Sequence, residues 1–221
     1  MDMSETRTAG QAAARLIRDK IFTGELPSGA GLNQAELARE FGMSRIPIRD
    51  ALQSLAAEGF VELRAHATAS VTPLGIDDLR ELYEIRTALE PHLCVLAIGN
   101  LDADRFDEME ATLDAMEADP DIPGWLRANN RFHQLIYGAS GRNRTVDFIN
   151  SIRRQTDRYT RIYYTLDREV AELEHRMILE AARRGQEKRL HGLVLAHLSA
   201  GYETIAPLTE SIPAAGEEPL A

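Results

Sequence analysis

Apolar residues recur three and four positions apart through most of the chain, which is the spacing of helices that bury one face. From Gly75 onward this pattern is interrupted near 99–102, 119–124, 140–143, 165–167 and 185. Alternating β-branched residues, which would indicate strands, do not compete with it. The second part of the chain is therefore predicted to be an all-α bundle of about six helices.

The segment before residue 75 has a different pattern. A short helix is expected over 34–41, with Gly42 in the place where a left-handed residue ends a helix. Ser44 then suits the N-cap of a second helix, whose apolar stripe is Ile48, Ala51, Leu52 and Leu55. Two short apolar runs, 60–63 and 70–71, predict strands around a polar tip, or wing. The fold class expected for the whole chain is mainly α, with an N-terminal winged helix-turn-helix.

The second of these helices carries paired arginines at its N-terminal end. Arg45 and Arg49 lie four residues apart and therefore on one side, near backbone N–H groups that favour phosphate. In helix-turn-helix proteins these positions enter the major groove, where arginine can bond guanine bidentately. Ser44, Arg64 and His66 are further candidates for DNA contacts, the last two at the backbone or the minor groove. The alternative is an ordinary α+β corner with solvated arginines.

These residues together resemble the GntR family of winged-helix regulators, in its FCD branch. The similarity covers residues 10–73 and includes ELA at 36–38 and SRIPIRDAL at 44–52. The resemblance implies that Arg39, Arg45 and Arg49 contact operator DNA. Relatives commonly have a glycine at the tip of the wing, whereas this chain has Ala65, His66 and Ala67.

Length and charge agree with a division into two domains. The 221 residues are enough for two cores, and the net charge of −10 arises mainly after residue 75. A negative total does not exclude DNA binding, because only the local surface meets phosphate. We expect a DNA-binding domain over 1–73, an effector-binding and dimerisation domain over 74–208 and a flexible tail over 209–221. A hinge is expected at 72–76.

The single cysteine and the N-terminal charges indicate where the protein acts. Cys94 cannot form an internal disulfide and lies between apolar residues, so we expect a buried side chain rather than a nucleophile. Charged residues interrupt the apolar stretch near the N-terminus, and no uncharged run reaches membrane-spanning length. A cytoplasmic protein without membrane contact is expected.

Three histidines occupy helix positions that are expected to be buried. His133, His175 and His197 each have apolar neighbours three or four residues away. A lone histidine on such a face is usually a core residue with one hydrogen bond, but three on different helices can converge on an ion. Imidazole ligands suit Zn²⁺ or Ni²⁺. Asn129, four residues before His133, could add an amide oxygen.

The resemblance extends to this cluster. NNRFH at 129–133, EH at 174–175 and His197 are similar to the metal motif of FCD domains, which commonly has an aspartate at the position of Asn129. It implies that Asn129, His133, His175 and His197 bind a divalent metal ion. A neutral amide donates less charge than a carboxylate, so this substitution is expected to change the affinity for the ion.

A charged residue also falls on an apolar stripe. Arg86 lies among Leu82, Leu89, Leu93 and Leu96, and a buried arginine needs an anion. The sequence leaves two possible anions for Arg86: Glu90, one turn further on, or a carboxylate effector. In FCD regulators a similar arginine lies near the ligand cavity. Arg153 and Arg154 are further candidates for effector contacts.

The predicted function is transcriptional regulation by a homodimer that binds a palindromic operator. A small organic acid would bind at the metal site and change how the two winged domains are spaced. One alternative is a regulator for which the ion itself is the effector. Another is a zinc-dependent hydrolase, which lacks a general base because Glu174 is expected to point about 100° away from His175 around its helix.

Overall fold

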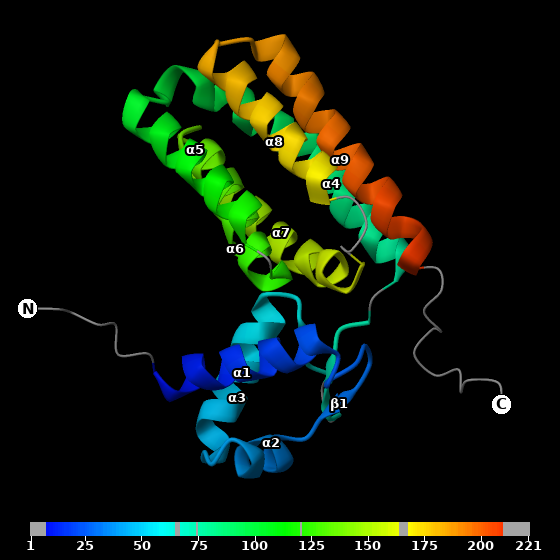
Figure 1. Ribbon diagram of the computed structural model, residues 1–221. Helices are drawn as coiled ribbons and strands as arrows, with labels where there is room; N and C mark the ends of the chain where they lie inside the picture. Colours follow the sequence, from blue (N-terminus) through cyan, green and yellow to red (C-terminus); the bar gives the residue numbers. More distant parts are fainter. Residues whose placement is uncertain (1–7, 65–66, 74, 120, 164–167, 210–221) are drawn as a thin grey trace, which may run out of the picture. The chain divides into compact units, whose positions relative to one another are not determined.

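The computed structural model describes residues 8–64, 67–73, 75–119, 121–163 and 168–209. The chain forms two compact units that divide between residues 74 and 75 (Figure 1). Each unit is considered on its own. Residue 74 of the expected hinge and residues 210–221 of the expected tail lie outside the described residues.

The N-terminal unit contains three helices and a small sheet. Its elements are α1 (Ala9–Thr23), β1 (Gly31–Leu32), α2 (Gln34–Glu40), α3 (Arg45–Ala57), β2 (Val61–Glu62) and β3 (Ala69–Val71). The strands pair antiparallel in the order β1-β3-β2, with Leu32 opposite Ala69 and Val61 opposite Val71. Helices α1 and α2 both pack against α3. This arrangement confirms the predicted winged helix-turn-helix.

The sheet differs from the prediction in two respects. Strand β1 was not expected, because two residues are too few to show an alternating pattern. Strand β2 is shorter than the apolar run from 60 to 63: Phe60 is buried ahead of the strand, while Leu63 is 50% exposed. The polar tip thus begins at Leu63 rather than after it.

Local sequence explains the geometry of the helix-turn-helix. Asn33 caps α2 by accepting two backbone N–H groups of the first turn. Gly42 follows α2 with a φ of 63°, a left-handed conformation in which a side chain would be strained. The N–H of Met43 then donates to the carbonyl of Ala38 at 2.9 Å and closes the turn. The apolar stripe of α3 is thereby buried against α1 and α2.

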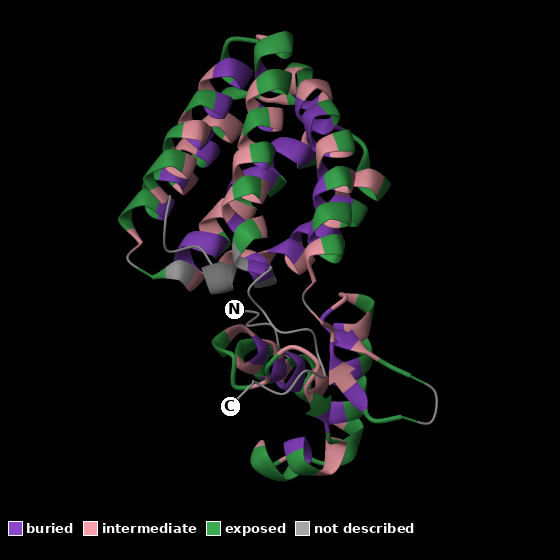
Figure 2. Ribbon diagram, turned by 90° about the vertical axis from the view of Figure 1, so that its right-hand side faces the viewer, coloured by how far each residue is buried: buried purple, intermediate pink, exposed green. Residues whose placement is uncertain are grey.

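The C-terminal unit is helical. Its elements are α4 (Ile76–Ala97), the 3₁₀ turn η1 (Ile98–Asn100), α5 (Ala103–Ala118), α6 (Ile122–Gly138), α7 (Asn143–Tyr163), α8 (Arg168–Arg183) and α9 (Glu187–Thr209). These six α-helices of the described residues confirm the predicted bundle. Helix α4 packs against α6, α7 and α9, and α8 packs against α5 and α9. Buried residues follow the sides where the helices face one another (Figure 2).

The buried face of α4 matches only in part the stripe that its leucines predicted, since Leu93 is buried as expected. The structure buries Tyr83, Arg86 and Glu90, whereas Leu82 and Leu89 are only half-buried. Since α4 packs against three helices, more than one side of it is covered, and polar positions are enclosed together with apolar ones. This helix therefore brings an ion pair into the core.

The helices were compared with what a membrane-spanning segment requires. Across the described ranges, none of them combines the length and the apolar character that crossing a bilayer requires.

Candidate functional site

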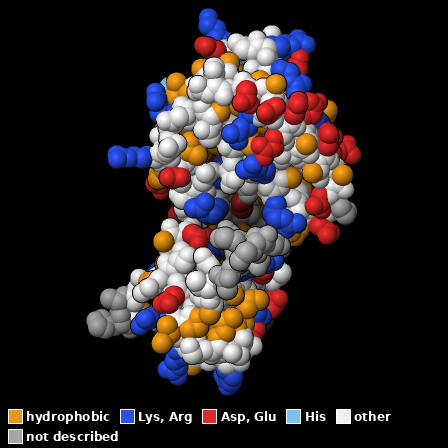
Figure 3. Space-filling view, turned by 90° about the vertical axis from the view of Figure 1, so that its left-hand side faces the viewer, with side chains coloured by type: hydrophobic (Ala, Val, Ile, Leu, Met, Phe, Trp, Pro, Cys, Tyr) orange, Lys and Arg blue, Asp and Glu red, His pale blue; other side chains and the backbone are white. Residues whose placement is uncertain are grey.

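The N-terminal unit exposes arginines around the start of α3. Arg45 and Arg49 are exposed, while Ile48 between them is fully buried, so both guanidinium groups lie on the outer face. Arg39 is exposed in the last turn of α2, the helix that packs beside α3. Figure 3 shows basic side chains projecting from this unit. Such groups can bind phosphate and the edges of guanine.

The other predicted DNA contacts are partly placed by the structure. Ser44 holds the N-cap position of α3, but its exposed hydroxyl makes no cap hydrogen bond. Arg64 is exposed and donates to Glu62 at 2.8 Å, an exposed ion pair that DNA phosphate could replace. His66 lies outside the described residues.

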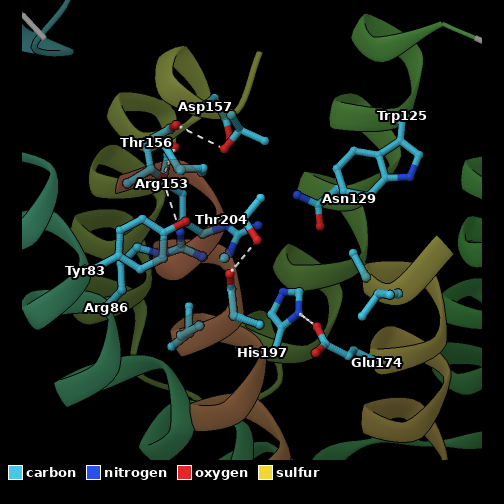
Figure 4. Close-up of a pocket in the computed structure, with 17 residues that line it drawn as sticks. Tyr83, Arg86, Trp125, Asn129, Arg153, Thr156, Asp157, Glu174, His197 and Thr204 are labelled. Carbon is cyan, nitrogen blue, oxygen red and sulfur yellow. Dashed lines mark hydrogen bonds and ion pairs between the residues drawn. The ribbon is translucent and has the colours of Figure 1, made fainter. Parts of the chain in front are cut away.

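The C-terminal unit contains a cavity of about 200 Å³ between α4, α6, α7, α8 and α9. Its polar lining consists of Tyr83, Arg86, Trp125, Asn129, Arg153, Thr156, Asp157, Thr160, Glu174, His197 and Thr204, most of which Figure 4 labels. The volume equals that of roughly seven water molecules. A small organic molecule would fit such a cavity, and the polar side chains of its wall would orient it.

Three histidines from different helices meet at this wall. His133 comes from α6, His175 from α8 and His197 from α9. His197 lines the cavity, and His133 and His175 are buried with only 2% and 0% of their surfaces exposed. One ring nitrogen of each lies within 4.8 Å of the others, and the Nε2 atoms of His133 and His175 are 3.1 Å apart. Packing thus joins residues that are far apart in the sequence.

Two of these rings are held by acidic and phenolic partners. Nδ1 of His197 lies 2.7 Å from Oε2 of Glu174 (Figure 4), and Nδ1 of His133 lies 3.0 Å from the Tyr137 hydroxyl. That hydroxyl in turn donates to Glu90. A proton on each Nδ1 satisfies these bonds and leaves Nε2 of both rings with a free lone pair, the form that ligates metals.

Burial keeps the inner imidazoles neutral. It lowers the pKa of His133 well below its ordinary value, and the charge of Arg153 adds to the effect. Burial also lowers the pKa of His175, helped by His197. Neutral imidazole is the form that binds divalent ions.

The residues fit a divalent ion. Nitrogen ligands at about 2.0–2.1 Å from a tetrahedral ion stand roughly 3.3 Å apart, close to the separation of the two inner Nε2 atoms. Asn129 lines the same cavity, and its Oδ1 is buried without a hydrogen-bond partner among the described residues. An ion would satisfy this oxygen, which receives no donor from the described residues.

A buried ion pair lies beside the histidines. Nε of Arg86 donates to Oε1 of Glu90 at 2.7 Å, and Arg153 donates to Oε2 of the same carboxylate at 3.4 Å. Burial opposes ionisation of Glu90, but Arg86 and Arg153 outweigh it and lower its pKa below the ordinary value. Of the two partners that the sequence left open for Arg86, the structure thus shows Glu90, and Thr156 is a second one at 3.4 Å.

The predicted effector contacts separate into two groups. Arg86 and Arg153 line the cavity, whereas Arg154 is not among the residues of its wall. Arg154 follows Arg153 on α7 and therefore points about 100° further around the helix. The sequence could not distinguish these neighbours, because both flank the same apolar positions.

Sequence reasoning missed several groups at this site. Glu174 was expected to point away, but it contacts the back of His197, because His197 arrives on another helix rather than at the position of His175. No role at the site was predicted for Tyr137 or Asp157, although Tyr137 lies four residues after His133 and Asp157 four after Arg153, a spacing that places each pair on one face.

An exposed arginine-bearing recognition helix and a ligand cavity in a helical unit define a DNA-binding regulator with a ligand-responsive domain. Two protein-family descriptions match the chain: "Bacterial regulatory proteins, gntR family" over residues 9–71 and "FCD domain" over residues 81–200. The chain therefore belongs to the GntR family of transcriptional regulators, with an FCD effector-binding domain.

Individual relatives agree with this membership. The chain is 27% identical over 203 residues to the HTH-type transcriptional regulator YdhC of Bacillus subtilis (strain 168). This match covers 88% of the present chain and 89% of the relative. It is 26% identical over 179 residues to the Nta operon transcriptional regulator of Aminobacter aminovorans, covering 80% and 85%. These families and relatives are transcriptional regulators and not enzymes, as predicted, and the hydrolase hypothesis is set aside.

Solved structures show the same fold. A GntR family regulator from Pseudomonas syringae pv. tomato str. DC3000 shares 28% identity with a TM-score of 0.56, covering 92% of this chain and 88% of that one. E. coli McbR/YncC shares 19% identity with a TM-score of 0.77, and the match covers 92% of this chain and 99% of that one. At this identity the comparison shows only that the folds are alike.

Proposed function

We propose that this regulator is a cytoplasmic homodimer that binds a palindromic operator and responds to a small carboxylate held beside a divalent metal ion. Arg39, Arg45 and Arg49 would contact DNA, with α3 in the major groove. Two copies would supply the two recognition helices that a twofold operator needs.

The observation that carries the effector proposal is the meeting of three histidines and two buried arginines at one cavity. His197, Arg86 and Arg153 line the same wall, with His133 and His175 behind it. Neutral imidazole rings suit a metal ion, whereas cationic guanidinium groups suit an anion. The two sets of side chains would therefore bind different groups.

The histidines and Asn129 would hold Zn²⁺ or Ni²⁺. When bound, the ion would act as a Lewis acid that attracts an oxygen of the effector. Because three imidazoles and an amide carry no charge, this ligand set leaves the charge of a divalent ion uncompensated. An anionic effector would balance it.

The arginines would bind the carboxylate of the effector. Glu90 is shared by Arg86 and Arg153, so one carboxylate serves two cations. The bond from Arg153 is long, at 3.4 Å, and each guanidinium has five N–H donors. Donors therefore remain for a carboxylate, which arginine recognises with charge-assisted hydrogen bonds.

Helix α7 offers a physical route from the cavity to the hinge. It carries Arg153, Thr156 and Asp157 in the cavity wall. Six residues after Arg153, the hydroxyl of Tyr159 lies 3.2 Å from both the N and the O of Gly75, the residue just before α4. A shift of α7 on effector binding would move Gly75 and change the spacing of the DNA-binding domains.

His175→Ala tests this proposal. The variant is expected to lose metal by roughly tenfold or more and to lose its response to small organic acids, with operator affinity unchanged in their absence. Elemental analysis and operator titration measure both, and His191→Ala, an exposed histidine of α9, is the control. Unchanged metal content and response in His175→Ala would contradict the proposed site.

A second candidate is that the ion itself is the effector, because the histidine cluster is largely buried and includes a residue of α9, which packs against α4 and α7. Operator affinity titrated with Zn²⁺ or Ni²⁺ alone separates the two. A several-fold change without any acid would favour the metal-responsive regulator, and no change would favour the carboxylate.

A further inference from the structure

Helix α3 exposes a large apolar side chain at its N-terminal end. Ile46 is the second residue of α3, directly after Arg45, and 63% of its surface is exposed. The other isoleucine and leucine side chains of this helix, Ile48, Leu52 and Leu55, are at most 1% exposed. Burial of apolar surface stabilises a fold, so the side chain of Ile46 contributes little of this kind to the free protein.

Helix geometry places Ile46 opposite the buried stripe of α3. Successive residues of an α-helix are turned by about 100°, so Ile46 is turned by roughly 170° from the middle of that stripe. Arg49 and Gln53, both exposed, are turned from Ile46 by only roughly 60° and 20°. Ile46 therefore lies in the middle of the outer face of α3, next to an arginine.

The outer face of a recognition helix meets the edges of the base pairs in the major groove. Arginine on this face bonds to the acceptors of guanine, but isoleucine has neither a donor nor an acceptor in its side chain. The apolar group that bases present in the major groove is the C5-methyl of thymine. An isoleucine in this place thus fits one base better than the other three.

We propose that Ile46 is a specificity-determining residue that packs against the C5-methyl group of a thymine in the operator. The inference rests on the proposed function, because it requires α3 in the major groove. Contact between the two apolar groups would remove both from water. A cytosine in the same place would present an amino group, which isoleucine leaves without an acceptor.

The position of this thymine relative to the guanine follows from the helix. Ile46 and Arg49 are three residues apart, which is about 4.5 Å along the axis of α3. Successive base pairs are about 3.4 Å apart, so the two side chains would reach neighbouring base pairs. Each half of the operator is expected to contain a thymine beside the guanine that arginine binds.

The neighbouring charges favour DNA over a protein as the partner that covers Ile46. Arg45 and Arg49 are both exposed beside it, and guanidinium groups of this kind attract a polyanion. A protein that covered Ile46 would make operator affinity independent of the thymine methyl group. The experiment below therefore distinguishes the two partners.

Deoxyuridine tests the contact, because uracil lacks only the methyl group of thymine and forms the same base pair. The probe is a duplex that the full-length protein selects from a pool of random sequences. Deoxyuridine then replaces the thymines of both half-sites, one symmetric pair at a time, and fluorescence anisotropy measures the affinity. At one pair the affinity should fall about 15-fold, or about fourfold for each methyl group that leaves a contact. Equal affinity at every pair, or a selected half-site without thymine, would overturn the proposal.

Ile46→Ala tests the residue itself. In this variant the loss of affinity caused by deoxyuridine should be less than about twofold, because the side chain that contacts the methyl group is gone. Ile46→Val keeps the branched methyl groups and should retain most of the effect. Leu16→Ala, which alters an exposed leucine of α1, is the control and should retain all of it. An undiminished effect of deoxyuridine in Ile46→Ala would overturn the role of this residue.

These outcomes separate the inference from the proposed function. If the protein selects no specific duplex, the proposed operator recognition and the role of Ile46 both fail. If Arg49→Ala loses specific binding while deoxyuridine has no effect at any thymine, the proposed place of α3 stands and only the role of Ile46 fails.

Discussion

Single residues of the C-terminal cavity are oriented by their hydrogen-bond partners. Glu174 holds His197, Tyr137 holds His133, and Asn130 holds both Arg153 and Asp157. Partners of this kind select the tautomer of an imidazole and limit the rotamers of its neighbours. The cavity is therefore organised before any ligand arrives, which reduces the entropy that binding would lose.

The residue on which operator recognition depends most is predicted to be Arg49. Arg49→Ala should weaken specific operator binding about 10- to 100-fold, because a bidentate contact with guanine discriminates by about 1–3 kcal/mol. The melting temperature should stay unchanged, since the side chain is exposed. Fluorescence anisotropy measures the affinity, and Arg15→Ala, an exposed arginine of α1, is the control. Retained specific binding would contradict the assignment.

Among the elements, α7 connects the cavity with the end of the unit where α4 begins. It packs against α4, α6 and α9, and its residues contact the cavity and Gly75. Much of its length was predictable as an amphipathic helix. Its role was not, because periodicity indicates which residues share a face but not what that face meets.

The contact of α7 with Gly75 can be tested by removing one hydroxyl. Tyr159→Phe should reduce the effector-induced change in operator affinity several-fold, with basal affinity within about twofold, because the ring still packs but the tie to Gly75 is lost. The lost hydrogen bonds should lower stability by about 1 kcal/mol. Operator titration with and without effector measures the response. Tyr202→Phe on α9 is the control, and an unaltered response in Tyr159→Phe would exclude this route.

At the scale of the whole molecule, charge is distributed unevenly between the two units. The net charge of −10 arises mainly in the C-terminal unit, while exposed arginines mark the recognition helix. A repulsive total field slows approach to DNA without preventing contact by a local basic surface. The helical core that supports the cavity also encloses the single cysteine, Cys94.

Cys94 should report the unfolding of the C-terminal unit. Burial raises the pKa of its thiol well above the ordinary value, with Glu90 adding to the effect, so the native protein holds neither an accessible thiol nor a thiolate. Iodoacetamide at pH 8 should modify native protein at least about 100-fold more slowly than denatured protein. Mass spectrometry follows the reaction. Zn²⁺ with a bound acid should slow it further, because ligands stabilise the folded state, and rapid labelling of native protein would contradict this burial.

The order of helices, the turn at Gly42, the paired arginines and the histidine positions were determined by the sequence alone. Each of these depends on local spacing, on backbone conformation or on residue chemistry, and all are visible over a few residues. Tertiary structure decided that three histidines meet, that Glu90 joins two arginines and that Asp157 faces the cavity while Arg154 does not. These outcomes depend on how each helix is rotated and packed against several others, and that choice is made by the energy of the whole core rather than by any one segment.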